Sequence, residues 1–261
     1  MSSRAEFRAR HIGGAAFAAL AAGPAKVFAS FARSFYVETR AGIACVGGRG
    51  LGLGPLNAIV EDFEPCAVGN SVFIETGDAK TWKPSVPCGA EKIPGIAIPE
   101  SIAGPAERFL DWIAGSGKPD DSLIGLGPGL TPAGDDFVGG AMIALRAFGD
   151  HELAERIAGW ALRLAKKNTG RISRAHLQCA ASGEGHEALH DLLCSFDEKH
   201  LQRLARVGHS SGLDAAAGAM LALGAARKAR QREYSRPVNG HAFGTFSPAS
   251  GTLTPESKGD S

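Results

Sequence analysis

The pattern of hydrophobic and polar positions changes once along the chain, near Ser101. Upstream, from about Val27 to Ser85, apolar and β-branched residues form short runs separated by glycine turns. Several such runs at close spacing predict short strands and are typical of a small β-barrel or sandwich. Downstream, apolar residues recur every three or four positions, which predicts amphipathic helices. The pattern therefore predicts an α+β protein, with an N-terminal small β-barrel or sandwich followed by a C-terminal helical bundle domain.

The clearest strand prediction is a hairpin, in which residues 35–38 and 43–46 flank a turn at 39–42. Residues 56–60 and 71–75 predict two further strands. The intervening loop at 47–55 holds five glycines and Arg49. Such a loop can wrap an anion, and an ordinary mobile glycine-rich hairpin loop is the alternative.

Prolines separate the two halves and predict a stiff linker. We expect an N-terminal segment (1–26), a β-rich domain with its Pro-rich linker (27–99), a helical domain (100–230) and a disordered tail (231–261). Arginines followed by an Ala/Gly-rich run in the first segment have the layout of a secretory signal. The run is only weakly apolar, so a short N-terminal helix or a frayed segment is the alternative.

Charge and cysteine content narrow the class of protein. With 28 basic and 27 acidic residues the net charge is +1, so we expect no overall electrostatic attraction to nucleic acid or to an anionic membrane. No stretch approaches the roughly 20 apolar residues that a membrane span needs. The five cysteines are scattered and form no C-x-x-C pair, which argues against a disulfide framework and a zinc knuckle. We therefore expect a cytoplasmic protein that binds neither nucleic acid nor membrane.

The stretch most suggestive of a site is Gly125–Asp136, with sequence GLGPGLTPAGDD. Its glycines allow positive φ and close backbone approach, its prolines stiffen the turns, and Thr131 adds a hydroxyl. An apolar helical run follows, whose Gly139-Gly140 pair suggests close packing against another backbone. Because the first N–H groups of a helix are unpaired, this start can bind an anion or be capped by an Asp. A connector with an ordinary Asp cap is the alternative.

Two further helix starts, 168–173 and 209–214, carry similar small, hydroxyl-bearing or acidic residues. If the three starts converge, their N–H groups and hydroxyls can line one anion-binding pocket. Capping alone would explain each start separately. The candidate substrate-binding residues are Gly127, Gly129, Thr131, Gly134, Thr169, Arg171, Ser173, Ser210, Ser211 and Gly212.

The candidate catalytic residues are Asp135, Asp136, His209 and Asp214. Adjacent helical carboxylates point about 100° apart, so one of the first two is expected to brace the loop. The other can act as a base, orient an amide, or hold Mg²⁺ through water; no residue is assigned as a direct metal ligand. The cations available for an anionic substrate are Arg171, Arg174 and Lys166-Lys167.

Residues 127–137 (GPGLTPAGDDF), 171–173 (RIS) and 208–214 (GHSSGLD) together resemble a bacterial uncharacterised-domain family. That family includes the third subunit of the oxamate carbamoyltransferase of allantoin degradation, and the resemblance spans about Val27 to Gly224. It implies a subunit that moves a carbamoyl group between phosphate and oxamate, giving oxalurate, in purine nitrogen catabolism. Carbamoyl phosphate or oxamate as substrates, and other carbamoyltransferase subunits as partners, follow from it. A non-catalytic scaffold or sensor subunit and a metal-assisted amidohydrolase are the alternatives.

Overall fold

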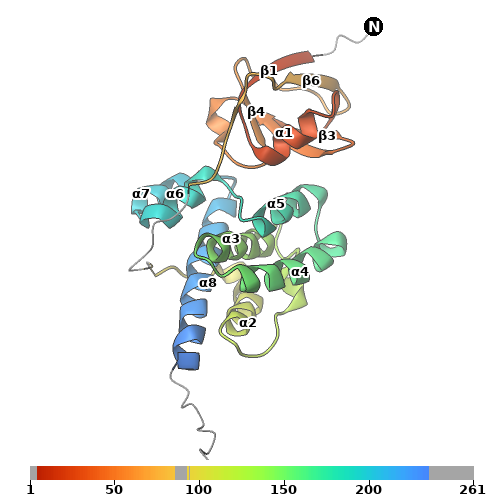
Figure 1. Cartoon of the computed structure of the whole chain (residues 1–261). Coiled ribbons are helices and arrows are strands. Elements are labelled where there is room, and N and C mark those ends of the chain that lie inside the picture. The colour runs from red at the N-terminus through yellow and green to blue at the C-terminus, as the bar shows by residue number, and fades with distance from the viewer. Residues whose placement is uncertain (1–4, 86–92, 94, 235–261) are drawn as a thin grey trace, which may run out of the picture.

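The computed structural model describes residues 5–85, 93 and 95–234 and divides them between a β-barrel and a helical domain (Figure 1). This confirms the predicted α+β class, with the barrel first. In the described part of the chain, six strands close into the barrel and a seventh pairs with β1. The strands are β1 (Ala5–Ile12), β2 (Ala25–Ser30), β3 (Ser34–Thr39), β4 (Gly42–Gly47), β5 (Asn57–Val60), β6 (Ser71–Glu75) and β7 (Lys80–Thr81).

The strand order is β5-β4-β3-β2-β6-β1, and an antiparallel β5–β1 pairing closes the ring. The predicted hairpin forms β3 and β4, which pair antiparallel from Ser34↔Gly47 to Thr39↔Gly42. The core of the barrel is built from inward-facing apolar side chains such as Phe35, Val37 and Val46, each 0% exposed. Closure leaves no long open edge between the first and last strands of the ring.

The barrel begins upstream of the Val27 start that we expected from the sequence. Ala9 and Ile12 of β1 point into the core, while Arg8 and Arg10 lie on the outside and pair with acidic residues. The short helix α1 (Gly14–Leu20) adds Leu20 and alanines to the same core. The charged residues of β1 occupy every second position, as they do in a half-buried strand. These arginines are the ones that gave the segment the layout of a secretory signal.

The helical domain is organised around the buried helix α3. Its helices are α2 (Ala103–Ile113), α3 (Ala133–Ala147), α4 (His151–Asn168), α5 (Arg171–Ala181), α6 (Glu187–Ser195), α7 (Glu198–Leu204) and α8 (Ser211–Tyr234). Short 3₁₀ turns lie at Glu100–Ile102 and Asp121–Leu123 in this domain, and at Arg49–Leu51 between β4 and β5 of the barrel.

Helices α3 and α8 approach so closely that Gly140 and Gly218 have no room for a side chain. A Cβ on Gly140 would lie 1.9 Å from the Ala215 carbonyl oxygen, and one on Gly218 would lie 1.8 Å from that of Phe137. The close packing expected from Gly139-Gly140 is therefore confirmed at Gly140. At Gly139 the nearest atom, the Ala180 Cβ, would be at an ordinary 3.6 Å.

The barrel sits over the end of the helical domain formed by α5 and α6 (Figure 1). Arg171 Nη1 donates a hydrogen bond to Glu38 Oε2 at 2.7 Å, and the Glu187 N–H donates to the Leu53 carbonyl at 2.8 Å. The Trp82 and His190 rings meet edge-on at 5.7 Å. Helices α5 and α6 therefore contact the barrel.

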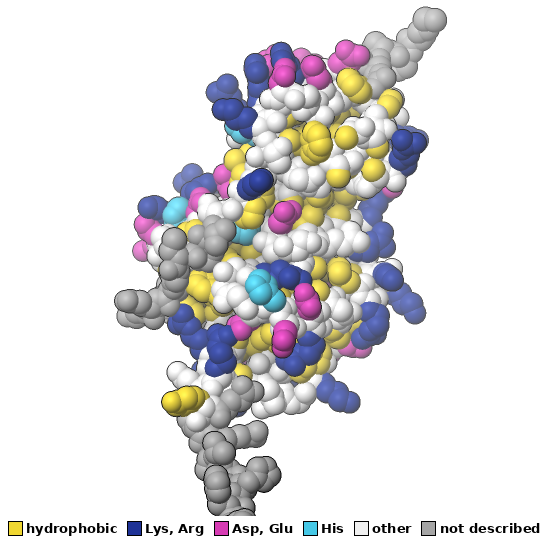
Figure 2. Space-filling model, viewed as in Figure 1, with side chains coloured by type: hydrophobic (Ala, Val, Ile, Leu, Met, Phe, Trp, Pro, Cys, Tyr) yellow, Lys and Arg dark blue, Asp and Glu magenta, His cyan; other side chains and the backbone are white. Residues whose placement is uncertain are grey.

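Pro84 and Pro99 of the expected linker are described, whereas Pro87 and Pro94 lie outside the described residues. The expected tail lies outside them from residue 235, and residues 231–234 form the last turn of α8. Among the described helices, none combines the length and apolar character needed to cross a bilayer. On the face shown in Figure 2, basic and acidic side chains are interspersed over both domains.

Candidate functional site

The three helix starts singled out from the sequence meet in the structure. The Thr131 Oγ1 and Ser211 Oγ atoms, which precede α3 and begin α8, lie 2.8 Å apart in a hydrogen bond. Ser173, in the first turn of α5, donates a hydrogen bond to Asp135 Oδ2 at 2.6 Å. Side chains from α3, α5 and α8 therefore converge on one place.

Glycines allow the loop before α3 to reach this place. Gly125 has φ +85°, and a Cβ there would lie 2.1 Å from the Asn168 carbonyl oxygen at the end of α4. A Cβ on Gly134 would lie 1.9 Å from the Leu123 oxygen, and Gly127 has φ +117°. These contacts explain why the stretch is rich in glycine: L side chains would be strained or would clash at these positions.

Asp135 braces the loop. Its Oδ1 accepts a hydrogen bond from the Gly125 N–H at 2.8 Å, and its Oδ2 accepts the one from Ser173. The residue is 2% exposed. Because each oxygen has a partner, Asp135 connects α3 and α5 to the glycine loop.

Asp136 has the properties of a reactive carboxyl. Burial raises its pKa well above the ordinary value, and the charges of Asp214 and Asp135 raise it further, while hydrogen bonding from the Ser211 and Thr131 hydroxyls acts in the opposite direction. Its Oδ2 atom is buried and has no hydrogen-bond partner. A carboxyl of this kind can gain or lose a proton nearer to neutral pH.

Asp214 is the second carboxyl with an unsatisfied oxygen. It is 5% exposed, and its Oδ2 is buried without a partner. Burial raises its pKa, and the Ser210 hydroxyl partly offsets this. Thr169 Oγ1, near the start of α5, is likewise buried without a partner. Buried polar atoms are normally satisfied, and the charges of Asp136 and Asp214 act on each other, so their two unpaired oxygens suggest a place for a ligand.

Other predicted residues are exposed beside the meeting point of α3, α5 and α8, or are required for close packing. His209 and Ser210 are exposed in the turn before α8, and Gly129 is exposed in the loop before α3. A Cβ on Gly212 would lie 2.1 Å from the Leu204 oxygen, so this glycine has a packing role.

The predicted cation Arg171 faces the barrel. Its guanidinium carbon lies 3.8 Å from the centre of the Phe28 ring, in addition to the Glu38 contact. Of the other predicted cations, Arg174 is half-buried and the lysines 166 and 167 are exposed.

Tyr36 of the barrel was not among the residues expected from the sequence. Burial raises its pKa well above the ordinary value, and the charge of Cys45, hydrogen bonding with the Cys45 thiol and the charge of Asp136 raise it further. Its position between the inward-facing Phe35 and Val37 of the predicted strand already implied an outward side chain. The sequence does not show which helices cover that face.

Within the described residues, no group of three or more His, Cys, Asp or Glu side chains is placed to hold a metal ion. Asp136 and Asp214, with the Thr131 and Ser211 hydroxyls, are the oxygen donors available should Mg²⁺ bind through water.

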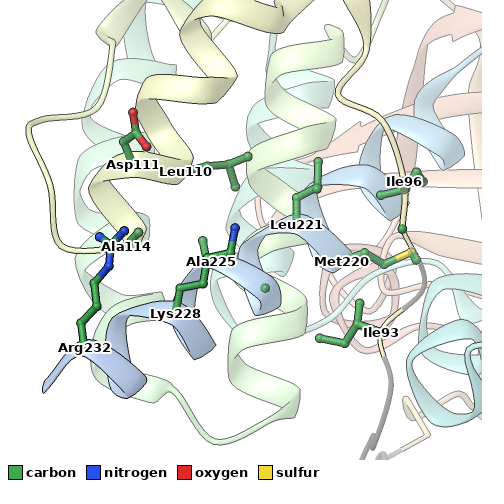
Figure 3. A pocket seen from close by; sticks show the side chains of 12 residues that line it. Ile93, Ile96, Leu110, Asp111, Ala114, Met220, Leu221, Ala225, Lys228 and Arg232 are labelled. Atoms are coloured by element: carbon green, nitrogen blue, oxygen red, sulfur yellow. The ribbon is translucent and has the colours of Figure 1, made fainter. Parts of the chain in front are cut away.

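Two hollows lie elsewhere. One, of about 340 Å³, runs between α2 and α8 and is mainly apolar, with Lys228 and Arg232 at one end (Figure 3). The other, of about 320 Å³, lies between the barrel and α5 and includes Cys179 and Glu184. Neither is lined by any of the predicted site residues.

The family model described as "Oxamate carbamoyltransferase subunit AllH" matches residues 123–223. The chain is therefore similar to this family over that part of the helical domain, which confirms the resemblance inferred from the three motifs. The matched range contains all three helix starts, whereas the expected resemblance upstream of Leu123 lies outside it. No curated protein and no solved structure matches the chain significantly.

Proposed function

We propose that this chain is a subunit of an oxamate carbamoyltransferase, and that the meeting point of α3, α5 and α8 binds the amide or carbamoyl group of the substrate. The similarity to the family of that enzyme's subunit supports the first part. The second part rests on the location of the matched range, which includes Thr131, Asp136, Ser211 and Asp214.

One observation carries the proposed ligand: the buried Oδ2 atoms of Asp136 and Asp214 have no partners. A primary amide or carbamoyl group presents two N–H donors, which carboxylate oxygens accept. Phosphate, an anion, would be repelled by the same oxygens when they are ionised. This place therefore suits the nitrogen end of oxamate or oxalurate better than the phosphate of carbamoyl phosphate.

The chemistry follows from the raised pKa of Asp136. When oxalurate forms, the oxamate nitrogen bonds to the carbamoyl carbon, the carbon–oxygen bond to phosphate breaks, and the nitrogen loses one proton. The ionised Asp136 accepts that proton, because a carboxylate with a raised pKa is the stronger base. Asp214 orients the amide, and Asp135 holds the loop.

The anionic ends of the substrates need cations. Arg171 is already paired with Glu38, which leaves Arg174, Lys166-Lys167 or a residue of another subunit for this role. We accordingly propose that the chain works with other carbamoyltransferase subunits. Purine nitrogen catabolism in the cytoplasm, without nucleic-acid or membrane partners, is the proposed setting.

Calorimetry and thermal melting with oxamate, oxalurate, carbamoyl phosphate and phosphate test the site. A ligand at a hundredfold excess over its Kd adds about 2.7 kcal/mol of apparent stability. We expect oxamate or oxalurate to bind the wild type and the surface control Glu107→Gln equally, and to bind Asp214→Asn at least tenfold more weakly. Equal binding to all three proteins contradicts the site, and binding to none contradicts the proposed function.

A turnover assay distinguishes a catalytic carbamoyltransferase subunit from a scaffold or sensor subunit and from a metal-assisted amidohydrolase. With its partner subunits, a catalytic chain should lose about a hundredfold or more in rate in Asp136→Asn, beyond the loss of affinity that calorimetry measures for the same variant. A rate unchanged by this substitution would instead favour the scaffold or sensor role. Loss of activity on chelation, regained with Mg²⁺, Mn²⁺ or Zn²⁺, would favour the metal-assisted amidohydrolase.

A further inference from the structure

The outer face of strand β3 is turned toward the helical domain. Side chains alternate along the strand, with Phe35 and Val37 fully buried in the barrel core, so Tyr36 and Glu38 point outward. Glu38 accepts the hydrogen bond from Arg171, the first residue of α5. The same outer face therefore places Tyr36 beside the helix start that holds Ser173.

Tyr36 lies in the seam between the domains. Its ring centre lies 6.1 Å from that of Phe28 and 6.4 Å from that of Phe31, and the Arg171 guanidinium covers Phe28. Cys45, its cross-strand partner, lies on the same outer face but is only 2% exposed. The helical domain covers this face of the barrel.

The contacts continue from this seam to the candidate site. Two positions after Arg171 in α5, Ser173 donates its hydrogen bond to Asp135, the neighbour of Asp136. Independently, the charge of Asp136 contributes to the raised pKa of Tyr36, after burial and Cys45. The first observation connects the seam to the start of α3, and the second indicates that the Tyr36 side chain lies within range of the charge on Asp136.

We propose that the Tyr36 hydroxyl forms the barrel side of the site and donates a hydrogen bond to the carbonyl oxygen of the bound amide or carbamoyl group. This rests on the proposed function and adds a residue from outside the range that the family model matches. Asp136 and Asp214 then accept the N–H groups, and Tyr36 faces the oxygen on which negative charge develops during transfer. Tyr36 keeps its proton throughout, so it stabilises charge and transfers no atom.

The placement of Tyr36 can be tested without a ligand, because the chain has two tyrosines. In the Tyr234→Phe background, 3-fluorotyrosine labelling gives one ¹⁹F resonance, from Tyr36. We expect this resonance to titrate with the Asp136 carboxyl, to lose that step in Asp136→Asn, and to keep it in the surface control Glu107→Gln. A resonance whose pH dependence is the same in Asp136→Asn overturns the placement.

The proposed contact is tested by calorimetry with oxamate and oxalurate on Tyr36→Phe. Loss of a hydrogen bond that the ligand cannot replace should weaken binding by about tenfold, with Tyr234→Phe unchanged. If Asp214→Asn loses affinity but Tyr36→Phe does not, the proposed contact is overturned and the proposed function stands. If the wild type binds neither ligand, the proposed function fails, and the ¹⁹F titration still decides where Tyr36 lies.

Discussion

Asp136 occupies a position where local and tertiary effects oppose each other. It lies in the first turn of α3, where the helix dipole favours a negative charge. Burial and the nearby carboxylates Asp214 and Asp135 disfavour that charge more strongly, so its pKa is raised. A residue that is unfavourable as an ion and yet lies at the meeting point of three helices has the character of a functional group.

The raised pKa predicts how stability depends on pH. Because the folded protein binds the Asp136 proton more tightly than the unfolded chain does, the stabilisation is complete below the ordinary pKa of 3.8 and is lost as pH rises through the folded value. Asp136→Asn cannot ionise, so we expect it to melt higher than the wild type at pH 8, with a smaller difference at pH 4. Each kcal/mol should appear as about 2–4 °C in Tm.

Thermal melts by circular dichroism across pH 4–8 measure this effect. Glu107→Gln, an exposed substitution, should track the wild type at every pH. An Asn variant that is less stable by the same amount at pH 4 and pH 8 would show that Asp136 acts as a structural hydrogen-bond acceptor instead.

The division of roles between the two neighbouring carboxylates was predictable in part. The helical geometry of about 100° per residue showed that Asp135 and Asp136 could not serve one ligand in the same way. Which of them braces the loop depends on Gly125 and Ser173, which approach from other parts of the chain. His209 looked like a candidate because of its glycine/serine turn, yet it is exposed.

Among the elements, α3 and α8 form the closest pair, and their separation depends on glycine. Gly140→Ala would push a methyl group into the Ala215 carbonyl, so we expect a loss of about 1–3 kcal/mol in the free energy of unfolding. The same substitution at Gly159 of α4, where a Cβ meets no atom within 4 Å, should instead stabilise by about 0.5–1 kcal/mol.

Urea denaturation of the two variants measures both values with one matched pair. Because Gly140 and Gly159 lie in helix interiors, helix propensity acts in the same direction in each. A Gly140→Ala protein as stable as Gly159→Ala would show that α3 and α8 can move apart at no cost.

Strands were predicted correctly where a clear turn signal separates two apolar runs, and were missed where few large apolar residues mark the strand. The β3–β4 hairpin was readable because apolar strands flank a short turn. Strand β1 was not, because its outward positions carry arginines and the following helix is rich in alanine. Its inward positions are Ala5, Phe7, Ala9 and Ile12, of which two are small alanines, so the apolar signal is weak without the barrel around it.

At the scale of the whole molecule, neutral histidines join the domains. His186 Nδ1 accepts the Ala188 N–H, and His190 Nε2 accepts the Gly185 N–H, each at 3.1 Å. The rings also bond the backbone of Leu51 and Ser85, respectively, beside the barrel. Protonation would break the bonds to Ala188 and Gly185, which lie within the helical domain. It would also place a positive charge on rings that are buried beside the barrel, and separating the domains would return that charge to water.

We therefore expect acid to weaken the contact between the domains. Burial lowers the pKa of His190 to about 4, so its contribution is complete above the ordinary value of 6.5 and is lost as pH falls through about 4. For His190 the effect is on the order of 3 kcal/mol. Burial also lowers the pKa of His186, which acts in the same direction.

Limited proteolysis and small-angle scattering between pH 7 and pH 4 should show the domains separating in the wild type. His190→Phe keeps a ring against Trp82 but cannot be protonated, so its response to acid should be smaller. His151→Gln, at an exposed site, serves as the control. A His190→Phe protein with the wild-type response would place the acid-sensitive group elsewhere.

Local patterns were sufficient for the α+β class, the helical domain and the three helix starts, because hydrophobic periodicity and helix-start residues act over a few positions. Tertiary packing was needed to bring those starts together, because the hydrogen-bonded residues Thr131 and Ser211 are 80 positions apart in the sequence. It also gave Asp135 its partners in the loop and in α5, left Asp136 and Asp214 each with an unpaired oxygen, and turned the outer face of β3 toward α5. These features depend on burial and contact between distant segments, which no local window of the sequence contains.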